Sequence, residues 1–166
     1  MYDGEIELES KLGEGSTFFF HLNLKKANTT EIDINLEDQD LKNKVAILAE
    51  DNEINALVIN KLLSKWNVST KRAKNGNEAI ILAQETKVDF ILMDIHMPKM
   101  NGFDATKAIR TSQNINQTTP IFALTADVTA ANSHKYSHHF NGFLWKPIEI
   151  SKLFNTLSQA HIIKNT

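Results

Sequence analysis

From residue 44 onward, short apolar runs alternate with stretches in which apolar positions recur every three or four residues. Short bounded apolar runs are typical of buried strands, and the longer periodic stretches are typical of helices. The predicted strands are Val45–Ala49, Val68–Ala73, Phe90–Met93, Ile121–Leu124 and Phe143–Trp145, and the predicted helices are Ile54–Lys65, Glu78–Thr86, Phe103–Ser112, Val128–Ser137 and Ile148–Ile162. This alternation predicts an α/β fold, a (βα)5 doubly wound parallel sheet with helices on both faces.

The beginning of the chain follows a different pattern. Residues 1–26 contain two β-forming runs on either side of Gly13–Ser16, which predicts a β-hairpin. A two-stranded hairpin is marginally stable alone, so we expect it to pack on something. Residues 27–43 are rich in Asp, Glu, Asn and Thr, which is typical of a solvated acidic linker. The pattern therefore predicts an α/β domain at residues 44–166, preceded by a linker and a hairpin.

Composition and charge exclude several classes of function. The formal net charge of −2 gives no reason to expect binding to nucleic acid or to a membrane surface. The absence of cysteine excludes disulfides and thiol chemistry. The sequence has no signal peptide and no apolar run near the roughly 20 residues of a membrane span. We expect a cytoplasmic chain without direct membrane contact, which is compatible with a membrane-anchored parent protein.

Polar side chains follow four of the predicted strands, at the point where each strand ends. They are Glu50 and Asp51 after the first strand, Asp94 after the third, Thr125 after the fourth and Lys146 after the fifth. Ligands of open α/β sheets bind at this edge, so we expect these side chains to gather in one crevice. Crowded carboxylates need a cation, and oxygen ligands suit Mg²⁺. Asp94 would then be a nucleophile that forms an acyl phosphate, with Thr125 and Lys146 binding phosphoryl oxygens.

Each of these residues also has an ordinary structural explanation. Asp51 would cap the next helix, Thr125 would cap the helix that follows it, and Lys146 would be a surface lysine before a proline. Their shared position at one edge of the sheet favours a common site over these separate explanations.

Four segments of the α/β domain resemble the signature stretches of response-regulator receiver domains. They occur in the family's order and are Val45–Asn52, Ile91–Gly102, Ala123–Ala126 and Lys146–Ile148. The resemblance covers about residues 44–160. It implies the flavodoxin-like receiver fold with strand order 2-1-3-4-5 and a cis bond between Lys146 and Pro147.

This resemblance also implies a metal site around the phosphoacceptor. Asp94 would be the phosphoacceptor, and Glu50 and Asp51 would hold Mg²⁺ together with Asp94 and the backbone carbonyl of His96. The acid pair departs from the family's Asp-Asp pattern. Glu50 is longer than aspartate, so its contact to the ion is expected to run through water.

The same resemblance implies two-component signal transduction. Thr125 and Lys146 would bind the phosphoryl group, and Phe143 would be the switch aromatic. The donor would be a phosphohistidine on the parent or on a partner kinase, with a histidine phosphotransfer protein as a further partner. The surface that switches would comprise the helix at Val128–Ser137, the strand at Phe143 and the helix from Ile148, in a monomer or weak homodimer.

Residues 1–26 resemble the C-terminal strands of histidine-kinase ATPase domains, in the segments Gly4–Ile6 and Leu12–Phe18. This implies that the parent is a hybrid sensor histidine kinase. The nucleotide-binding residues of such a domain would lie upstream of this hairpin, and the chain has no phosphoacceptor-histidine motif. We therefore expect no ATP binding and no ATP-dependent activity. Gly13–Ser16 lacks the following lysine and helix of a phosphate-binding loop.

Three alternatives compete with the receiver hypothesis. A haloacid-dehalogenase-like phosphatase also uses Asp, Thr, Lys and Mg²⁺, but its nucleophile follows the first strand and a second Asp stands two positions later, where this chain has His96. A pseudo-receiver would bind a protein partner without phosphorylation, which the full set Asp51, Asp94, Thr125 and Lys146 disfavours. The third is a zinc site.

Such a zinc site would use His134, His138 and His139. The first two lie four residues apart and would share a helix face, but no cysteine or nearby acid completes the ligand set. His96 is expected at the rim of the acidic site, where it influences the access of water to an acyl phosphate, and not as a catalytic base.

Overall fold

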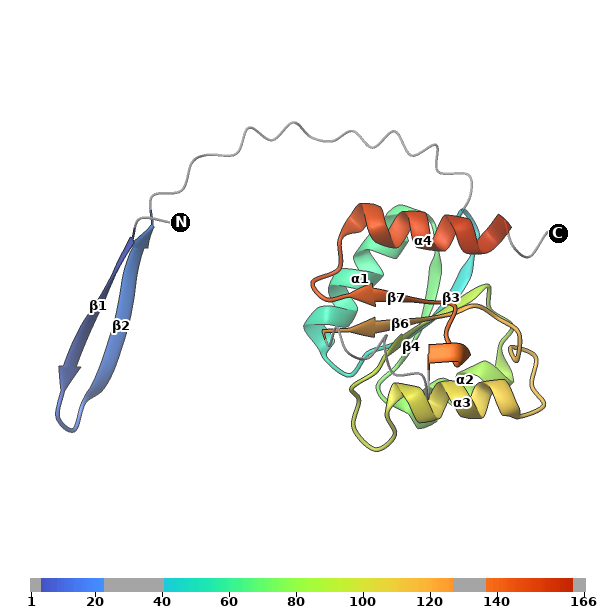
Figure 1. Cartoon of the computed structure of the whole chain (residues 1–166), viewed down its shortest axis with the longest axis horizontal. Helices are drawn as coiled ribbons and strands as arrows, with labels where there is room; N and C mark the ends of the chain where they lie inside the picture. The colour runs from blue at the N-terminus through green and yellow to red at the C-terminus, as the bar shows by residue number, and fades with distance from the viewer. Residues whose placement is uncertain (1–3, 23–40, 127–136, 163–166) are drawn as a thin grey trace. The chain divides into compact units, whose positions relative to one another are not determined.

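The computed structural model describes residues 4–22, 41–126 and 137–162. Contacts divide the chain into two compact units, Met1–Leu36 and Glu37–Thr166 (Figure 1). Most of the predicted linker at 27–43 falls outside the described residues, so its character stays a prediction.

The first unit contains the predicted β-hairpin. Strand β1 (Gly4–Lys11) pairs antiparallel with β2 (Gly15–Leu22). The turn needs glycine, because Gly13 has φ +84° and Gly15 has φ +106°, which L side chains rarely adopt. The two strands therefore reverse direction where the sequence places its glycines.

One face of this hairpin is apolar. The register places Ile6 opposite Phe20 and Leu8 opposite Phe18, so these four side chains share a face. All four are exposed, by between 56% and 77%. Phe19 pairs with Glu7 and belongs to the opposite face.

The second unit is built on a five-stranded parallel sheet in the order β4-β3-β5-β6-β7. Its strands are β3 (Val45–Ala49), β4 (Ser69–Ala73), β5 (Phe90–Asp94), β6 (Ile121–Thr125) and β7 (Gly142–Trp145). Counted from β3 as the first strand of the sheet, this order is 2-1-3-4-5, so the implied topology is confirmed. The peptide bond between Lys146 and Pro147 is cis, as implied.

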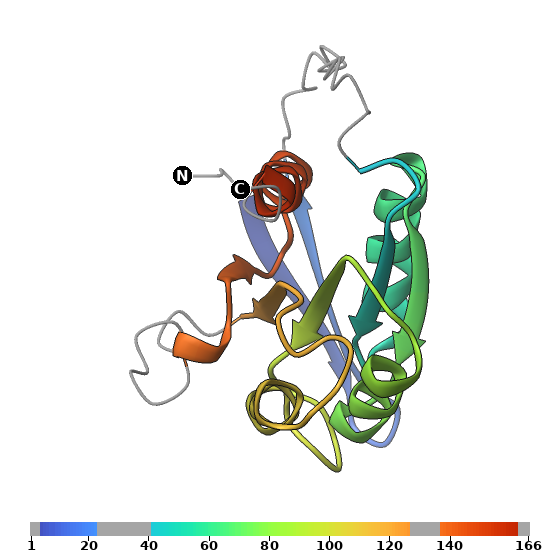
Figure 2. The ribbon, with the colours of Figure 1, turned by 90° about the vertical axis from the view of Figure 1, so that its right-hand side faces the viewer.

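Helices cover both faces of the sheet. They are α1 (Glu53–Lys65), α2 (Gly76–Glu85), α3 (Gly102–Thr111) and α4 (Ile150–Ile162), and a short 3-10 helix, η2, spans Ser137–His139. Helices α1 and α4 lie on one face and α2 and α3 on the other (Figures 1 and 2). The predicted helix at Val128–Ser137 lies outside the described residues except for Ser137. None of the described helices combines the length and apolar character needed to cross a bilayer.

Alternation along the strands supplies two apolar layers. On one face Ile47, Ile91 and Met93 pack in a cluster with the small side chains of α2 and α3, which are Ala79, Ala83 and Ala105. Their strand neighbours Leu48 and Leu92 point to the opposite face and are also buried. The central strands β3, β5 and β6 are therefore buried on both sides, and the polar residues at the strand ends are left to form a site at the edge of the sheet.

Candidate functional site

The loop after β3 presents two acids in different environments. Glu50 is fully buried and Asp51 is exposed. The cap of α1 is Asn52, whose Oδ1 accepts from the backbone N–H groups of Ile54 (2.9 Å) and Asn55 (3.1 Å). The capping role considered for Asp51 is therefore wrong. Its carboxylate is not needed to begin the helix.

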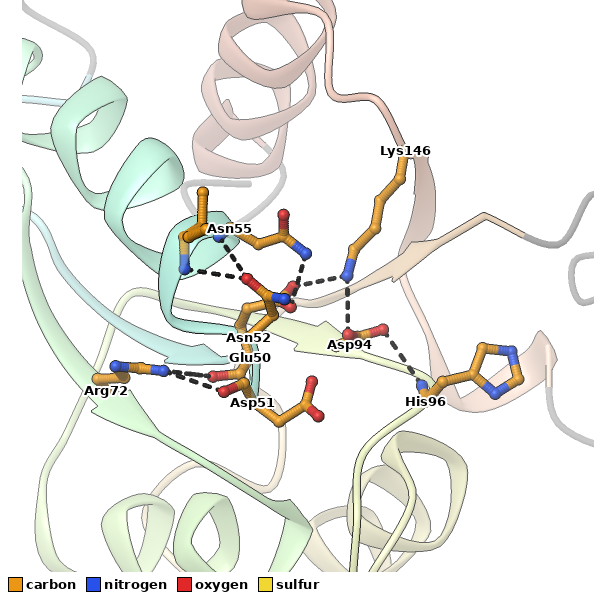
Figure 3. A network of polar contacts seen from close by, with 9 residues as sticks. Glu50, Asp51, Asn52, Asn55, Arg72, Asp94, His96 and Lys146 are labelled. Atoms are coloured by element: carbon orange, nitrogen blue, oxygen red, sulfur yellow. Dashed lines mark hydrogen bonds and ion pairs between the residues drawn. The ribbon is translucent and has the colours of Figure 1, made fainter. Parts of the chain in front are cut away.

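Asp94 ends β5 and meets Lys146 from the loop after β7 (Figure 3). The Nζ of Lys146 donates to Asp94 Oδ2 at 2.7 Å and to Glu50 Oε2 at 2.6 Å. The remaining oxygens of both carboxylates also accept hydrogen bonds, Asp94 Oδ1 from the amide of His96 (3.2 Å) and Glu50 Oε1 from Asn55 Nδ2 (3.1 Å). The buried charges are thus paired and hydrogen-bonded, as buried carboxylates must be.

Burial and pairing act on Lys146 in opposite directions. Burial by itself would lower the pKa of Lys146, because it disfavours the charged ammonium. Hydrogen bonds and negative charge from Asp94 and Glu50 outweigh that effect and raise its pKa above 10.5. The site therefore contains a firmly charged cation between two buried carboxylates.

Three carboxylates form a group that fits a metal ion. Glu50, Asp51 and Asp94 each offer one oxygen, and these three atoms lie within 4.8 Å of one another. It is the one such cluster of His, Cys, Asp or Glu in the part of the chain that the structure describes. Hard oxygen donors at the end of a parallel sheet suit a small divalent cation such as Mg²⁺.

Thr125 and Phe143 lie on the neighbouring strands β6 and β7. Thr125 ends β6 and is fully buried, and its carbonyl accepts from the amide of Lys146 at 2.7 Å. Phe143 is half-buried between Phe140 and Trp145, with ring centroids 5.6 Å and 6.3 Å away. This backbone hydrogen bond connects Thr125 to Lys146 of the site. The rings of Phe140, Phe143 and Trp145 form a row beside it.

His96 contributes its backbone amide to the site, while its exposed ring points away from Asp94 (Figure 3). This arrangement agrees with a residue at the rim and not with a catalytic base. The predicted contact of its carbonyl with an ion stays a prediction.

Of the histidines considered for zinc, His134 lies outside the described residues, so that hypothesis stays untested. Burial, with nearby positive charge, lowers the pKa of His139.

Three residues of the site were not anticipated from the sequence. Asn55 donates to Glu50, and Arg72 of β4 donates to the carbonyls of Glu50 and Asp51. A Cβ on Gly102 would lie 2.2 Å from the carbonyl oxygen of Asp94. Only glycine therefore lets the start of α3 approach the backbone of Asp94 so closely. The signal for Gly102 was its place in the segment Ile91–Gly102, whereas Arg72 lies far from that segment in the sequence.

Comparison with known proteins identifies the α/β unit. A family model described as "Response regulator receiver domain" matches residues 46–158. The autoinducer 2 sensor kinase/phosphatase LuxQ of Vibrio vulnificus is 33% identical over an alignment of 165 residues, and the match covers 95% of this chain and 19% of LuxQ. Sensor histidine kinase AruS of Pseudomonas aeruginosa is 30% identical over an alignment of 159 residues, and the match covers 95% of this chain and 16% of AruS. The chain thus spans less than a quarter of the length of these relatives.

Two solved structures show the same fold. The receiver domain of sensor histidine kinase PA1611 from Pseudomonas aeruginosa, crystallised with a magnesium ion coordinated in the active-site cleft, has a TM-score of 0.66 and 29% identity, covering 71% of this chain and 97% of that one. A chain from the complex of the Saccharomyces cerevisiae histidine phosphotransfer protein Ypd1 with the receiver domain of Ssk1 has a TM-score of 0.64 and 27% identity, covering 73% of this chain and 90% of that one.

Proposed function

Because this chain belongs to the response regulator receiver domain family, we propose that Asp94 is its phosphoacceptor in a two-component phosphorelay. The observation that carries the proposal is the ion-pair geometry at the edge of the sheet. Lys146 bridges Asp94 and Glu50, beside a third carboxylate on Asp51. A cation fixed next to a buried carboxylate is placed to bind the phosphoryl oxygens that arrive there.

The proposed step transfers a phosphoryl group from a histidine to a carboxylate. An oxygen of Asp94 attacks phosphorus, a P–O bond forms and the P–N bond to the imidazole breaks. The electron pair of the broken bond stays on the imidazole nitrogen, which then takes a proton from water. Lys146 compensates the phosphoryl charge, and the hydroxyl of Thr125 binds one phosphoryl oxygen.

We propose that Glu50, Asp51 and Asp94 hold Mg²⁺, with the carbonyl of His96 as a further ligand. When bound, the ion supplies charge neutralisation between the anionic phosphoryl group and the anionic nucleophile. The cluster within 4.8 Å supports this assignment, as does the magnesium ion in the similar receiver of PA1611. Glu50 is tied to Lys146 and Asn55, which supports a contact to the ion through water.

An exposed apolar patch on α1 supports a protein as phosphodonor. Ile54, Leu57 and Val58 are 73%, 53% and 53% exposed on α1, which begins directly after the acid loop. Val58 also lines a hollow of about 210 Å³ together with Lys146 and Pro147. We propose that a phosphohistidine domain of the parent or of a partner docks here, as histidine phosphotransfer protein Ypd1 was crystallised with a receiver domain.

The hairpin supports a hybrid histidine kinase as the parent protein. We propose that residues 1–26 are the end of a kinase ATPase domain and that residues 27–43 link it to the receiver. The matches to LuxQ and AruS extend over 95% of this chain, and therefore into the hairpin unit, which supports this assignment. By itself the chain would bind no ATP and act as a monomer or weak homodimer.

The competing explanations are not favoured. Asp94 ends the third strand of the sheet along the chain, and His96 stands where the phosphatase would need its second Asp. The complete set of carboxylates and Lys146 in contact disfavours a pseudo-receiver that is never phosphorylated.

Intact-mass analysis with acetyl phosphate and Mg²⁺ tests the proposal directly. We expect the mass of one phosphoryl group on the wild-type chain. Asp94→Asn should abolish labelling and Asp51→Asn should reduce it at least tenfold, because each removes a group that the reaction uses. Equal labelling of Asp94→Asn would refute the acceptor, and labelling that survives chelation unchanged would refute the metal role.

A further inference from the structure

Arg72 reaches from the edge strand β4 to the loop that carries both acids (Figure 3). Its Nη2 donates to the carbonyl of Asp51 at 3.2 Å and to that of Glu50 at 3.3 Å, and its Nε lies 3.4 Å from the same Glu50 oxygen. We infer that Arg72 is a positioning residue that holds the acid pair in the geometry needed for divalent-cation binding. This inference rests on the proposed function of the site.

The acid loop needs such a support because it lies between two regular elements. The amide of Glu50 still donates to Ala73 of the sheet at 3.0 Å, and the helix cap begins at Asn52. Between these points the carbonyls of Glu50 and Asp51 belong to neither the sheet ladder nor the helix. Fixing both carbonyls fixes the two peptide planes, and with them the directions in which the carboxylates leave the backbone.

Arginine suits this task better than lysine. Its planar guanidinium presents several donors in a fixed fork, so one side chain can hold two neighbouring carbonyls at once. The side chain of Arg72 is 32% exposed, and its Nη1 lies 3.9 Å from Glu53 Oε1, so this ion pair contributes little. The forked contacts to the carbonyls therefore carry the positioning.

Charge alone would have the opposite effect. A cation near the acid cluster repels a divalent ion, so removing it should strengthen Mg²⁺ binding if only its charge mattered. If Arg72 positions the acid pair, its removal should weaken Mg²⁺ binding. Lys74 is the matched control, because its Nζ pairs with the same Glu53 oxygen at 3.6 Å while the loop carbonyls are held by Arg72.

The test measures Mg²⁺ affinity of the full chain by calorimetry for wild type, Arg72→Met, Arg72→Lys and Lys74→Met. We expect both Arg72 variants to bind Mg²⁺ about threefold to tenfold more weakly, below the roughly 10–100-fold cost of losing a group bonded directly to a ligand. Lys74→Met should bind as wild type or more tightly. Tighter binding by Arg72→Met, with wild-type affinity for Arg72→Lys, would overturn the inference in favour of a pure charge effect.

A second measurement needs no metal. Hydrogen exchange of the amides of Glu50 and Ile54, which donate to Ala73 and to the side chain of Asn52 at the two ends of the loop, should be at least threefold faster in both Arg72 variants and unchanged in Lys74→Met, because the loop loses its side-chain support. Unchanged exchange would overturn the inference even if labelling of Asp94 succeeds. If exchange is faster in the Arg72 variants but the wild-type chain binds no Mg²⁺, the structural contact stands, whereas the cation role and the proposed Mg²⁺-dependent function are refuted.

Discussion

At the scale of single residues, the site is held together by one ammonium group. Lys146 is bonded to two buried carboxylates, and it is the group through which Glu50 and Asp94 share a counter-charge. In phosphoryl transfer the same ammonium would turn to the incoming oxygens, so its role before the reaction is to supply the counter-charge of two neighbouring buried carboxylates.

The raised pKa of Lys146 gives a prediction for alkaline stability. A group whose folded pKa is raised stabilises the fold fully below its unfolded pKa, near 10.5, and loses that contribution as pH rises through the folded value. Lys146→Met should lower the free energy of unfolding by about 2 kcal/mol at pH 8, because buried acids lose their cation. This difference should shrink above about pH 10.5.

Urea unfolding of wild type and Lys146→Met at several pH values between 8 and 11 would measure this difference. In an Asp94→Asn background the effect of Lys146→Met should be smaller, because one of the two carboxylates is already neutral. A difference that grows with alkaline pH would contradict the raised pKa.

Residues at strand ends were predictable, and residues that act across the sheet were not. Glu50, Asp94 and Lys146 each follow an apolar run, and parallel strands bring such positions together. Arg72 lies on a strand whose alternation is weak, and its contact depends on how β4 pairs with β3. Local patterns do not contain that pairing, so the contact could be found only in three dimensions.

At the scale of elements, four of the predicted helices are confirmed, but α1, α2 and α3 begin one or two residues before their predicted starts and α4 begins two residues after its predicted start. Each of α1, α2 and α3 begins behind an asparagine cap, which are Asn52, Asn75 and Asn101. At the start of α2, Asn75 Oδ1 accepts from the backbone amide of Glu78, and Asn75 Nδ2 donates to the carboxylate of Glu78. The apolar period reveals where a helix has its buried face, whereas capping residues reveal where it begins.

The exposed patch on α1 gives a prediction about donor choice. Leu57→Glu should slow transfer from a phosphorylated histidine phosphotransfer protein about tenfold, because an apolar contact at the centre of an interface is worth more than 1 kcal/mol. Labelling by acetyl phosphate should be unchanged, since this small donor needs no docking surface. Both rates are measured as the gain of a phosphoryl group by this chain, on a gel or by mass spectrometry; for the protein donor, its loss of the group is measured as well.

Ile81→Glu is the matched control for this experiment. Ile81 is 50% exposed on α2, similar to Leu57 at 53%, but α2 lies on the other face of the sheet. Equal slowing by both variants would mean a general effect of the added charge, and the patch would not be the docking surface.

At the scale of the whole molecule, the two units differ in how far each buries its own apolar side chains. The α/β unit buries both faces of its sheet, whereas the hairpin exposes four large apolar side chains on one face. Such a face is stable only when covered, which is consistent with the proposal that the hairpin belongs to a larger kinase domain. The sequence predicted both units because each has its own period. Local sequence patterns do not predict what packs on the apolar face of the hairpin.

A final prediction joins the site to distant packing. Phosphorylation of Asp94 would draw the hydroxyl of the buried Thr125 toward a phosphoryl oxygen. The dense core resists the void left behind, so Phe143 would turn inward from its half-buried position. The ring of Phe143 packs against Phe140, and the ring centroid of Phe140 lies 5.8 Å from that of Phe103, so the movement should reach α3.

Amide chemical shifts with and without beryllofluoride, a mimic of the phosphoryl group, measure this coupling. We expect the largest changes at the loops of the site, at Thr125–Ser137 and at Gly142–Lys146, with smaller changes near Phe103. The outcome should be a population shift between two packings and not a new fold. In Thr125→Ala the distant changes should fall away while those beside Asp94 remain, because the hydroxyl that transmits the movement is gone. Distant shifts that persist in Thr125→Ala would show that the coupling takes another route.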